Sequence, residues 1–231
     1  LHEEGFLIKI KKGIYKYDGT NWDIYNTLNS SLPSDQVKSI SFDPNNNLWV
    51  CTANAGLAKL SSAGIWTIYN KVNSMLPAND VNGIIFDIYN NAWIATKDGL
   101  AFKDNTDNWV IFNTTNSSII NNEILSIGLE YNNGQTIKWI GTSNGLIRYD
   151  DSNWEIYTTS NSLLTGNAVT NIHIDKNNNK WISVYNSNSN TGGGLIKIDS
   201  NNLWTQYNTA NSNIPSNQIY TISSDSTDTQ L

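Results

Sequence analysis

Cysteine is nearly absent from this sequence, because Cys51 stands alone and no internal disulfide can form. Histidine is scarce as well. Only His2 and His173 occur, which in practice excludes a zinc cluster built from the usual Cys and His ligands. In the repeats described below, Cys51 takes the place that Ala95 and Gly141 hold in others, so we expect a small buried thiol there.

Charged residues are also few, at 15% of the 231 residues, against 39% hydrophobic residues. Asn, Ser and Thr take their place and suit turns, because Asn and Ser hydrogen-bond their own backbone and Asn tolerates positive φ. The formal net charge of −6 disfavours nucleic acid, whose phosphates require a basic surface, and equally disfavours anionic lipid headgroups. The composition therefore predicts no nucleic-acid partner.

Long apolar runs are missing too. No run approaches the ~20 residues that a membrane-spanning helix needs, so we expect no direct insertion into a membrane. The sequence opens abruptly on "LHEEGFLIK", inside what reads as a strand. We therefore expect that an export signal has been removed.

Tryptophan, by contrast, is abundant and periodic. Residues 139–157 read "WIGTSNGLIRYDDSNWEIY", and residues 93–112 repeat the pattern as "WIATKDGLAFKDNTDNWVIF". The nine tryptophans form two series with spacings of 42 to 50 residues: Trp22, Trp66, Trp109, Trp154 and Trp204, and Trp49, Trp93, Trp139 and Trp181. Two tryptophans recurring together at a period of this length indicate a repeat architecture.

Each repeat reads as four short strands rich in Val, Ile, Trp, Tyr and Thr. An inner Trp lies in the second strand, a Gly begins the third, and an outer Trp opens the fourth. The first strand recurs as residues 37–43, 81–87, 124–130, 169–175 and 219–225. Links of hairpin length, rich in Asn or Gly, separate the strands. Four antiparallel strands in a repeat of this length are typical of a β-propeller blade.

The two ends of the chain complement one another. The C-terminal repeat stops after its first strand, residues 219–225, and the N-terminus supplies a second, third and fourth strand in residues 5–10, 13–18 and 22–26. We therefore predict an all-β fold: a five-bladed β-propeller of four-stranded antiparallel blades, closed by one C-terminal strand that joins three N-terminal strands. The blades of this single domain, residues 1–231, are expected at about 37–70, 81–113, 124–158, 169–208, and 219–231 plus 1–26. The alternative is a fragment of a larger ring.

The repeats resemble the two-component regulator propeller repeat family. That pattern is an apolar strand ending in Asp, a Gly/Asn turn, Trp-Ile-Gly-Thr, Gly-Leu and an aromatic-Asp close. One repeat matches it throughout, at Trp139, Ile140, Gly141, Thr142, Gly145, Leu146, Tyr149 and Asp150. Other repeats depart from it at Cys51, Ala95 and Ser183.

The resemblance implies a periplasmic or extracellular sensor or surface domain. Members of the family are often sensor regions of hybrid histidine kinases that respond to glycan fragments, and others are secreted or surface proteins. The family usually assembles larger rings, so five blades would be a departure. The expected partner is accordingly a small polar ligand or a glycan, or else a protein.

Acidic residues end every predicted first strand: Asp43, Asp87, Glu130, Asp175 and Asp225. Carboxylates around a propeller axis make a glycosidase imaginable. A catalytic pair needs unequal environments, however, and these acids recur in every blade. We therefore predict that they cap turns, and we read "DPNNN" and "DKNNN" as Asn-rich hairpins and not calcium loops.

Loops between the second and third strands vary most, and we expect them on the same face as the blade-to-blade crossings. Binding residues collect on such loops when the scaffold is rigid. The candidate ligand-binding residues are Lys11, Lys12, Asn54, Lys97, Asp98, Asn144, Tyr185 and Asn186, with His173 on an innermost strand. The last two loop positions begin an insertion, residues 185–194. His173 either contacts the axial channel or is packed or water-bonded, and no general-base partner for it is identifiable.

Three functions stay open at this point. The first is a non-enzymatic, extracytoplasmic propeller that binds or senses a ligand, with a glycan as one such ligand. The alternative is a protein-interaction scaffold on the cell surface, and a glycosidase or lyase is the third. No catalytic residues, metal site or cofactor are predicted.

Overall fold

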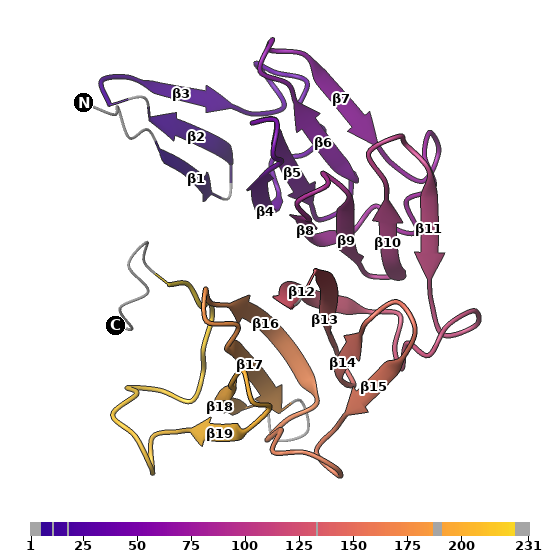
Figure 1. The fold of residues 1–231 in the computed structure, drawn as a ribbon. Coiled ribbons are helices and arrows are strands. Elements are labelled where there is room, and N and C mark those ends of the chain that lie inside the picture. The colour runs from indigo at the N-terminus through magenta and orange to yellow at the C-terminus, as the bar shows by residue number, and fades with distance from the viewer. Residues whose placement is uncertain (1–5, 11, 18, 133, 187–190, 225–231) are drawn as a thin grey trace. The chain divides into compact units, whose positions relative to one another are not determined.

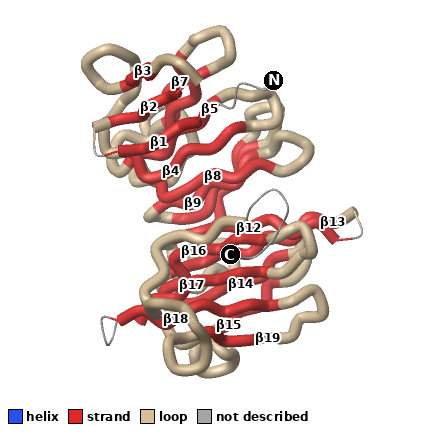
Figure 2. Tube along the Cα trace, turned by 90° about the vertical axis from the view of Figure 1, so that its left-hand side faces the viewer, coloured by secondary structure: helices blue, strands red, loops and turns tan. Residues whose placement is uncertain are grey.

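The computed structural model describes residues 6–10, 12–17, 19–132, 134–186 and 191–224, and these are built of strands, turns and loops. Figure 2 shows the strands in red and the loops in tan. None of the described residues forms a helix long and apolar enough to cross a membrane. The chain divides into two compact units, Leu1–Ile111 and Phe112–Leu231.

The first unit contains three antiparallel sheets (Figure 1). The N-terminal sheet has three strands, in the order β1 (Phe6–Ile10), β2 (Gly13–Tyr17) and β3 (Trp22–Tyr25). The next sheet consists of β4 (Val37–Phe42), β5 (Leu48–Thr52), β6 (Leu57–Leu60) and β7 (Trp66–Tyr69). The third consists of β8 (Val81–Phe86), β9 (Ala92–Thr96), β10 (Gly99–Lys103) and β11 (Trp109–Phe112).

The second unit contains two four-stranded sheets. One consists of β12 (Ile124–Asn132), β13 (Gln135–Thr142), β14 (Gly145–Tyr149) and β15 (Trp154–Tyr157). The other consists of β16 (Ala168–Ile174), β17 (Lys180–Asn186), β18 (Thr191–Ile198) and β19 (Trp204–Tyr207). In each four-stranded sheet the spatial order follows the chain, which confirms the four repeats that the tryptophan period predicts.

The N-terminal sheet differs from the prediction, because residues 219–224 form no strand and this sheet has three strands. Side chains of β16 hold the segment instead. The Asn171 amide donates to the Tyr220 carbonyl at 3.0 Å, and His173 Nε2 lies 2.9 Å from Ser224 Oγ. The predicted strand ends, Gly5 and Asp225, lie outside the described residues.

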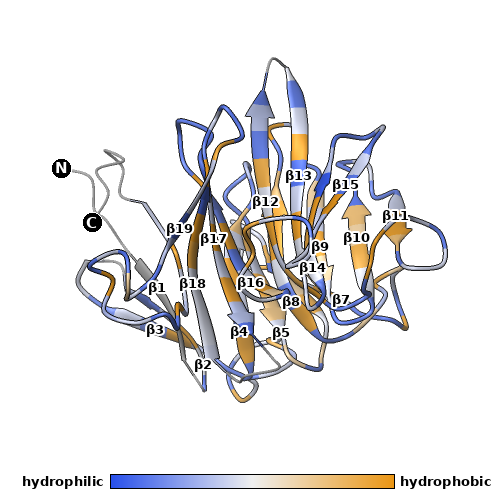
Figure 3. Cartoon of the chain, turned by 90° about the horizontal axis from the view of Figure 1, so that it is seen from below, coloured by the Kyte–Doolittle hydropathy of each residue, from blue (hydrophilic) through white to orange (hydrophobic). Residues whose placement is uncertain are grey.

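The core of each unit lies between neighbouring sheets. In the first unit, buried Val50 and Ala58 pack with Ile14, and Ile94 packs with Cys51. Cys51 is buried as expected. Strands β5 and β9 are buried along their whole length. Figure 3 shows apolar colour concentrated in the strands and hydrophilic colour in the turns.

Rows of aromatic rings cross from one sheet to the next, as the two tryptophan series suggest. Tyr69 of β7 stacks on the inner Trp49 with ring centroids 5.5 Å apart, and its other neighbour is the outer Trp109 of the next sheet at 6.1 Å. The second unit repeats this row with Trp139, Tyr157 and Trp204, at 6.1 and 5.2 Å. The tryptophan rings therefore pack neighbouring sheets against one another.

The crossings between sheets share one hydrogen-bonded frame. At the start of each, a backbone N–H donates to the Oδ1 of an Asn three residues later, at 2.7–2.9 Å. The next N–H donates to an Asp or Asn Oδ1 eight residues later, at 2.8–3.0 Å. The Asn-rich composition therefore supplies side chains that replace backbone partners in these long connections.

Glycine opens or precedes the third strands β2, β6 and β14, and another glycine lies inside β18, at places where a Cβ would lie 2.2–2.5 Å from a backbone carbonyl oxygen. Gly56 has a φ of +89°, and a Cβ at this position would lie 2.2 Å from the Tyr69 carbonyl oxygen. We expect Gly56→Ala to lower the free energy of unfolding by more than the ~1–3 kcal/mol that left-handed backbone alone costs. Gly64→Ala is the matched control, since its φ is +80° but nothing lies within 4 Å of its Cβ. Equal losses in urea denaturation of the two variants would contradict the clash.

Candidate functional site

The turns between second and third strands lie against the crossings, as predicted. In the first unit, Ala53 N donates to the Gln36 carbonyl at 3.0 Å, and Lys97 N donates to the Asp80 carbonyl at 3.1 Å. In the second unit, Ser143 N donates to the Glu123 carbonyl at 3.3 Å. Both partners in each pair belong to one face of their unit.

The candidate residues of the first unit are exposed on these turns. Lys12, Asn54, Lys97 and Asp98 have exposed side chains, and Lys11 lies outside the described residues. In the two four-stranded sheets of this unit a Thr holds the turn before the third strand, as where Thr96 Oγ1 donates to the Gly99 carbonyl at 2.7 Å. Each of these turns displays its exposed residues from a different sheet.

The candidate residues of the second unit are less uniform. Asn144 is exposed, whereas Tyr185, Asn186 and His173 are half-buried. The Asn186 amide donates to the Thr165 carbonyl at 3.4 Å, so the end of β17 lies against the crossing that precedes β16. His173 is bonded to the C-terminal segment as described above, which favours the packed reading over a ligand contact.

Three of the acids of the first strands cap turns, as predicted: Asp43, Asp87 and Asp175. Glu130 differs from the prediction, because β12 continues to Asn132 and Glu130 pairs with Ile137 inside the ladder. Asp43 Oδ2 accepts the indole N–H of Trp49 at 2.9 Å, and Asp175 Oδ2 accepts that of Trp181 at 3.0 Å. Glu130 accepts the indole N–H of Trp139 at 2.7 Å. The same aspartates also accept backbone N–H groups of their turns, for example from Asn47 and Asn179. Asp225 lies outside the described residues.

The capping aspartates make stability depend on acid pH. Burial opposes ionisation of Asp43, but hydrogen bonds from Trp49, Asn47 and Asn45 outweigh it and lower the pKa of this carboxyl below 3.8. The pKa of Asp175 is lowered in the same way. A folded-state pKa below the unfolded one contributes stability above about pH 4 that is lost as the pH falls through the folded value.

We expect the melting temperature to drop between about pH 4 and pH 2, and to drop less steeply in Asp43→Asn. A wild-type slope in Asp43→Asn would contradict the assignment.

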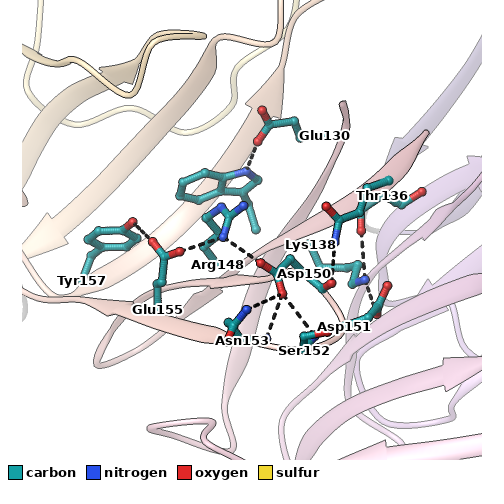
Figure 4. Close-up of polar contacts among 12 residues, drawn as sticks. Glu130, Thr136, Lys138, Arg148, Asp150, Asp151, Ser152, Asn153, Glu155 and Tyr157 are labelled. Atoms are coloured by element: carbon teal, nitrogen blue, oxygen red, sulfur yellow. Dashed lines mark hydrogen bonds and ion pairs between the residues drawn. The ribbon is translucent and has the colours of Figure 1, made fainter. Parts of the chain in front are cut away.

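Charged side chains that are buried or half-buried lie together on the sheet formed by β12–β15 (Figure 4). The Lys138 side chain is almost fully buried, pairs with the Asp151 carboxylate, and donates to the Thr136 carbonyl at 3.0 Å. Its ammonium also lies 4.9 Å from the centroid of the Tyr149 ring. The lysine is thus satisfied within its own sheet.

Arg148, the one arginine of the chain, bridges two carboxylates beside this lysine. Its Nη1 lies 3.2 Å from Asp150 Oδ2 and 2.7 Å from Glu155 Oε1, while the Tyr157 hydroxyl donates to Glu155 Oε2 at 2.6 Å (Figure 4). Burial, and then the bond to Glu155 and its charge, raises the pKa of Tyr157. Each of these carboxylates already pairs with the arginine, so the geometry of the cluster suits holding β14 and β15 together more than proton transfer.

A second buried lysine joins the two sheets of this unit. Lys180 Nζ lies 3.5 Å from Glu130 Oε1, donates to the Asp199 carbonyl at 3.1 Å, and lies 5.4 Å from the centroid of the Trp139 ring. The side chains of Lys180 and Glu130 are 0% and 7% exposed. The sequence carried a signal for both lysines, because each directly precedes an inner Trp where other repeats have Leu48 or Ala92.

A surface hollow of about 550 Å³ occurs in the first unit, between the edge strands β7 and β11. It is lined by Tyr69, Val72, Asn73, Ser74, Met75, Asp107 and Trp109. None of the residues selected from the sequence belongs to it. Its walls come from positions that recur in other repeats. The sequence alone therefore does not single out Asp107 or Met75, and only the placement of the sheets shows that they line one hollow. Among the described residues, no group of three His, Cys, Asp or Glu side chains is placed to hold a metal ion.

The comparisons with known proteins agree with the resemblance seen in the repeats. The two component regulator propeller model matches residues 31–54. No curated protein is significantly similar to the chain. The extracellular domain of BT4673, a proposed one-component system from B. thetaiotaomicron, is 24% identical with a TM-score of 0.67, over 90% of this chain and 27% of that one.

Two further solved structures show the same fold. The extracellular domain of BT3049, a proposed hybrid two-component system from B. thetaiotaomicron, is 19% identical with a TM-score of 0.69, over 97% of this chain and 36% of that one. Virginiamycin B lyase from Staphylococcus aureus is 13% identical with a TM-score of 0.65, over 90% of this chain and 67% of that one. The fold is therefore that of propeller proteins, and the chain spans only 27% and 36% of the two extracellular domains.

Proposed function

We propose that this chain is a non-enzymatic propeller that works outside the cytoplasm and binds or senses a polar ligand such as a glycan. The observation that carries the proposal is the combination of the propeller-family match at residues 31–54 with the fold of extracellular domains of proposed signalling proteins. Because the chain spans only part of those domains, its ligand and any signalling output belong to the proposal.

The hydrogen bonds that the acids of the first strands already accept support a non-enzymatic role. An acid–base pair requires carboxylates that can reach a substrate. Asp43, Glu130 and Asp175 instead each accept an indole N–H, and Asp87 accepts the N–H groups of Tyr89 and Asn91. Binding without turnover is therefore the simplest activity for this scaffold.

The test is a ligand screen of the protein by thermal shift, combined with a glycan array. A ligand that binds only the folded state at 100 times its dissociation constant stabilises by about 2.7 kcal/mol, which raises the melting temperature by several degrees. We expect such a rise with at least one polar ligand and no release of product from chromogenic glycosides. Turnover of any glycoside, or of a streptogramin, would overturn the non-enzymatic role.

We also infer that the propeller has five blades, with residues 219–224 as the missing strand of the N-terminal sheet. The crossing that leads to them has the frame of the other crossings: Asn208 N donates to Asn211 Oδ1, and Thr209 N to Asn217 Oδ1, both at 2.8 Å. Tyr207 and Trp22 also hold the repeat positions at which Tyr69 and Trp109 pack together.

Hydrogen exchange tests this closure. Pairing would protect backbone amides of β1 (Phe6–Ile10) in the full chain, and a chain that ends at Gln218 should lose that protection while β5 stays protected. The β5 amides control for general destabilisation. Identical exchange of β1 in both chains would contradict the closed ring.

A protein-interaction scaffold is the second candidate, favoured by exposed apolar side chains on the crossings. Leu28 and Val72, which occupy equivalent positions of their repeats, are each 94% exposed. Exposed apolar groups in patches mark protein-binding surfaces. A partner whose binding is lost in Leu28→Ser and Val72→Ser, with no ligand found in the screen, would favour this function over the first.

A further inference from the structure

The hollow between β7 and β11 has the walls of a binding site for a flat, partly apolar ligand. Small-molecule sites are concave, mostly apolar and fitted with a few polar groups. Here the Tyr69 and Trp109 rings provide the aromatic wall, and Val72 and Met75, which are 94% and 62% exposed, add aliphatic surface. Asp107 contributes the carboxylate.

The aromatic wall is fixed from behind. Tyr69 lies between the buried Trp49, stacked at 5.5 Å, and Trp109 at 6.1 Å. The crossing that forms the other wall is held by Asn73, whose amide donates to the Ile68 carbonyl at 2.9 Å, and by Ser74, whose hydroxyl donates to the Asn70 carbonyl at 2.7 Å. The side chains of these walls are therefore already ordered by the fold, so a ligand that binds them loses little additional conformational entropy.

Two polar groups in the hollow remain able to bond a ligand. Within the described part of the chain the Tyr69 hydroxyl has no hydrogen-bond partner. Burial, and then the nearby Asp107 charge, raises the pKa of Tyr69, so the hydroxyl stays a donor at neutral pH. The Asp107 side chain is 73% exposed and pairs with Lys103 through Oδ1, which leaves acceptor capacity on the other oxygen.

The equivalent place in the second unit lacks these groups. There Tyr157 and Trp204 form the same aromatic pair, at 5.2 Å, but the Tyr157 hydroxyl already donates to Glu155 at 2.6 Å. The position of Asp107, two residues before the outer Trp, is Asn202 in that repeat. The architecture is shared and the polar groups are specific to the first unit.

We propose that the hollow lined by Tyr69, Trp109 and Asp107 binds a neutral saccharide ring. The apolar face of a pyranose packs on an aromatic ring, while its hydroxyls need both a donor and an acceptor at the edge. Lys103 already neutralises Asp107, so a cationic ligand would have to compete with a buried lysine, whereas a sugar hydroxyl would not. The inference rests on the proposed function and adds to it a location in the first unit and the restriction to a neutral sugar ring.

The test is a titration of the protein with cellohexaose, xylohexaose, mannohexaose and maltohexaose, followed by tryptophan fluorescence and calorimetry. We expect binding of at least one, weakened at least tenfold by Tyr69→Phe and by Asp107→Asn, and lost in Trp109→Ala. Tyr157→Phe and Asn202→Ala are the matched controls and should change the dissociation constant less than twofold. Because Trp109 also packs against the core, the first two variants, which remove few atoms, carry the result if Trp109→Ala does not fold.

The outcomes separate this site from the proposed function. Hexasaccharide binding that Tyr69→Phe and Asp107→Asn leave unchanged would overturn the site and support the proposed function. Binding of tetramethylammonium in place of the sugars would overturn the ligand class. Binding of none of the four sugars would overturn the inference, while the thermal-shift screen with other polar ligands would still decide the proposed function.

Discussion

Trp139→Ala is expected to lower the free energy of unfolding by about 3–5 kcal/mol, the range for removing a large aromatic side chain from a core. Trp139 is 1% exposed and stacks with Tyr157 at 6.1 Å, so the truncation leaves a cavity between sheets. It also removes the indole donor that Glu130 accepts at 2.7 Å, which leaves a buried carboxylate less well bonded. Urea denaturation monitored by circular dichroism measures the loss.

Two companion variants resolve that loss into its parts. Trp139→Phe retains a ring but not the indole N–H, so we expect it to cost about 1.5–3 kcal/mol, the range for a hydrogen bond to a charged group. Tyr89→Ala removes an aromatic side chain that is 62% exposed and should change stability by about 0.5 kcal/mol or less. An Ala variant no less stable than the Phe variant would show that the cavity contributes nothing.

Most of the sheet architecture could be predicted because it repeats. A tryptophan at a fixed place in each unit marks the strand that lies between two sheets, and the structure places Trp49 and Trp139 there, 3% and 1% exposed. The capping role of Asp43 and Asp175 was predictable for the same reason, since a group found in every repeat is more economically explained by the repeat than by a unique site. The periodicity therefore identified what all repeats share.

Features that belong to one repeat were not predicted, and the reason is physical. Burial of Lys138 and Lys180 depends on neighbours 13 and 50 residues away, Asp151 and Glu130. The hollow likewise joins Tyr69 to groups near the start of β11, in the next repeat. Neither juxtaposition is visible until strands are placed beside one another. The candidate residues on the turns were chosen by variability, and variability alone does not distinguish a binding residue from a tolerated one.

The chain's termini show a further limit. Strand pattern predicts that residues 219–225 pair with the N-terminal sheet, and residues 219–224 satisfy the strand composition. In the structure, however, Asn171 and His173 contact Tyr220 and Ser224 through side chains, which need no ladder. A pattern of residues fixes which segments can be strands, but the pairing depends on whether an edge is presented to them.

The two buried lysines give the second large expected effect. Lys180→Met should cost about 3–5 kcal/mol, because it leaves Glu130 buried without its counter-ion. Lys138→Met is the matched control: this lysine also precedes an inner Trp and is equally buried, but its partner Asp151 has a side chain that is 61% exposed, against 7% for Glu130. Water can solvate Asp151 once its lysine is gone, so Lys138→Met should cost clearly less in urea denaturation.

A double variant shows whether the cost is the loss of attraction or the charge left behind. Replacing both partners of a buried pair with uncharged groups is often close to neutral, whereas removing one partner is not. Lys180→Met combined with Glu130→Gln should therefore be more stable than Lys180→Met alone, since Gln keeps an oxygen for the Trp139 indole. If the double variant is instead less stable than either single variant, the ion pair itself stabilises the contact between β12 and β17, and the desolvation argument is wrong. If Lys180→Met and Lys138→Met lower the free energy of unfolding equally, the solvent exposure of the carboxylate left without a lysine does not determine the size of the effect.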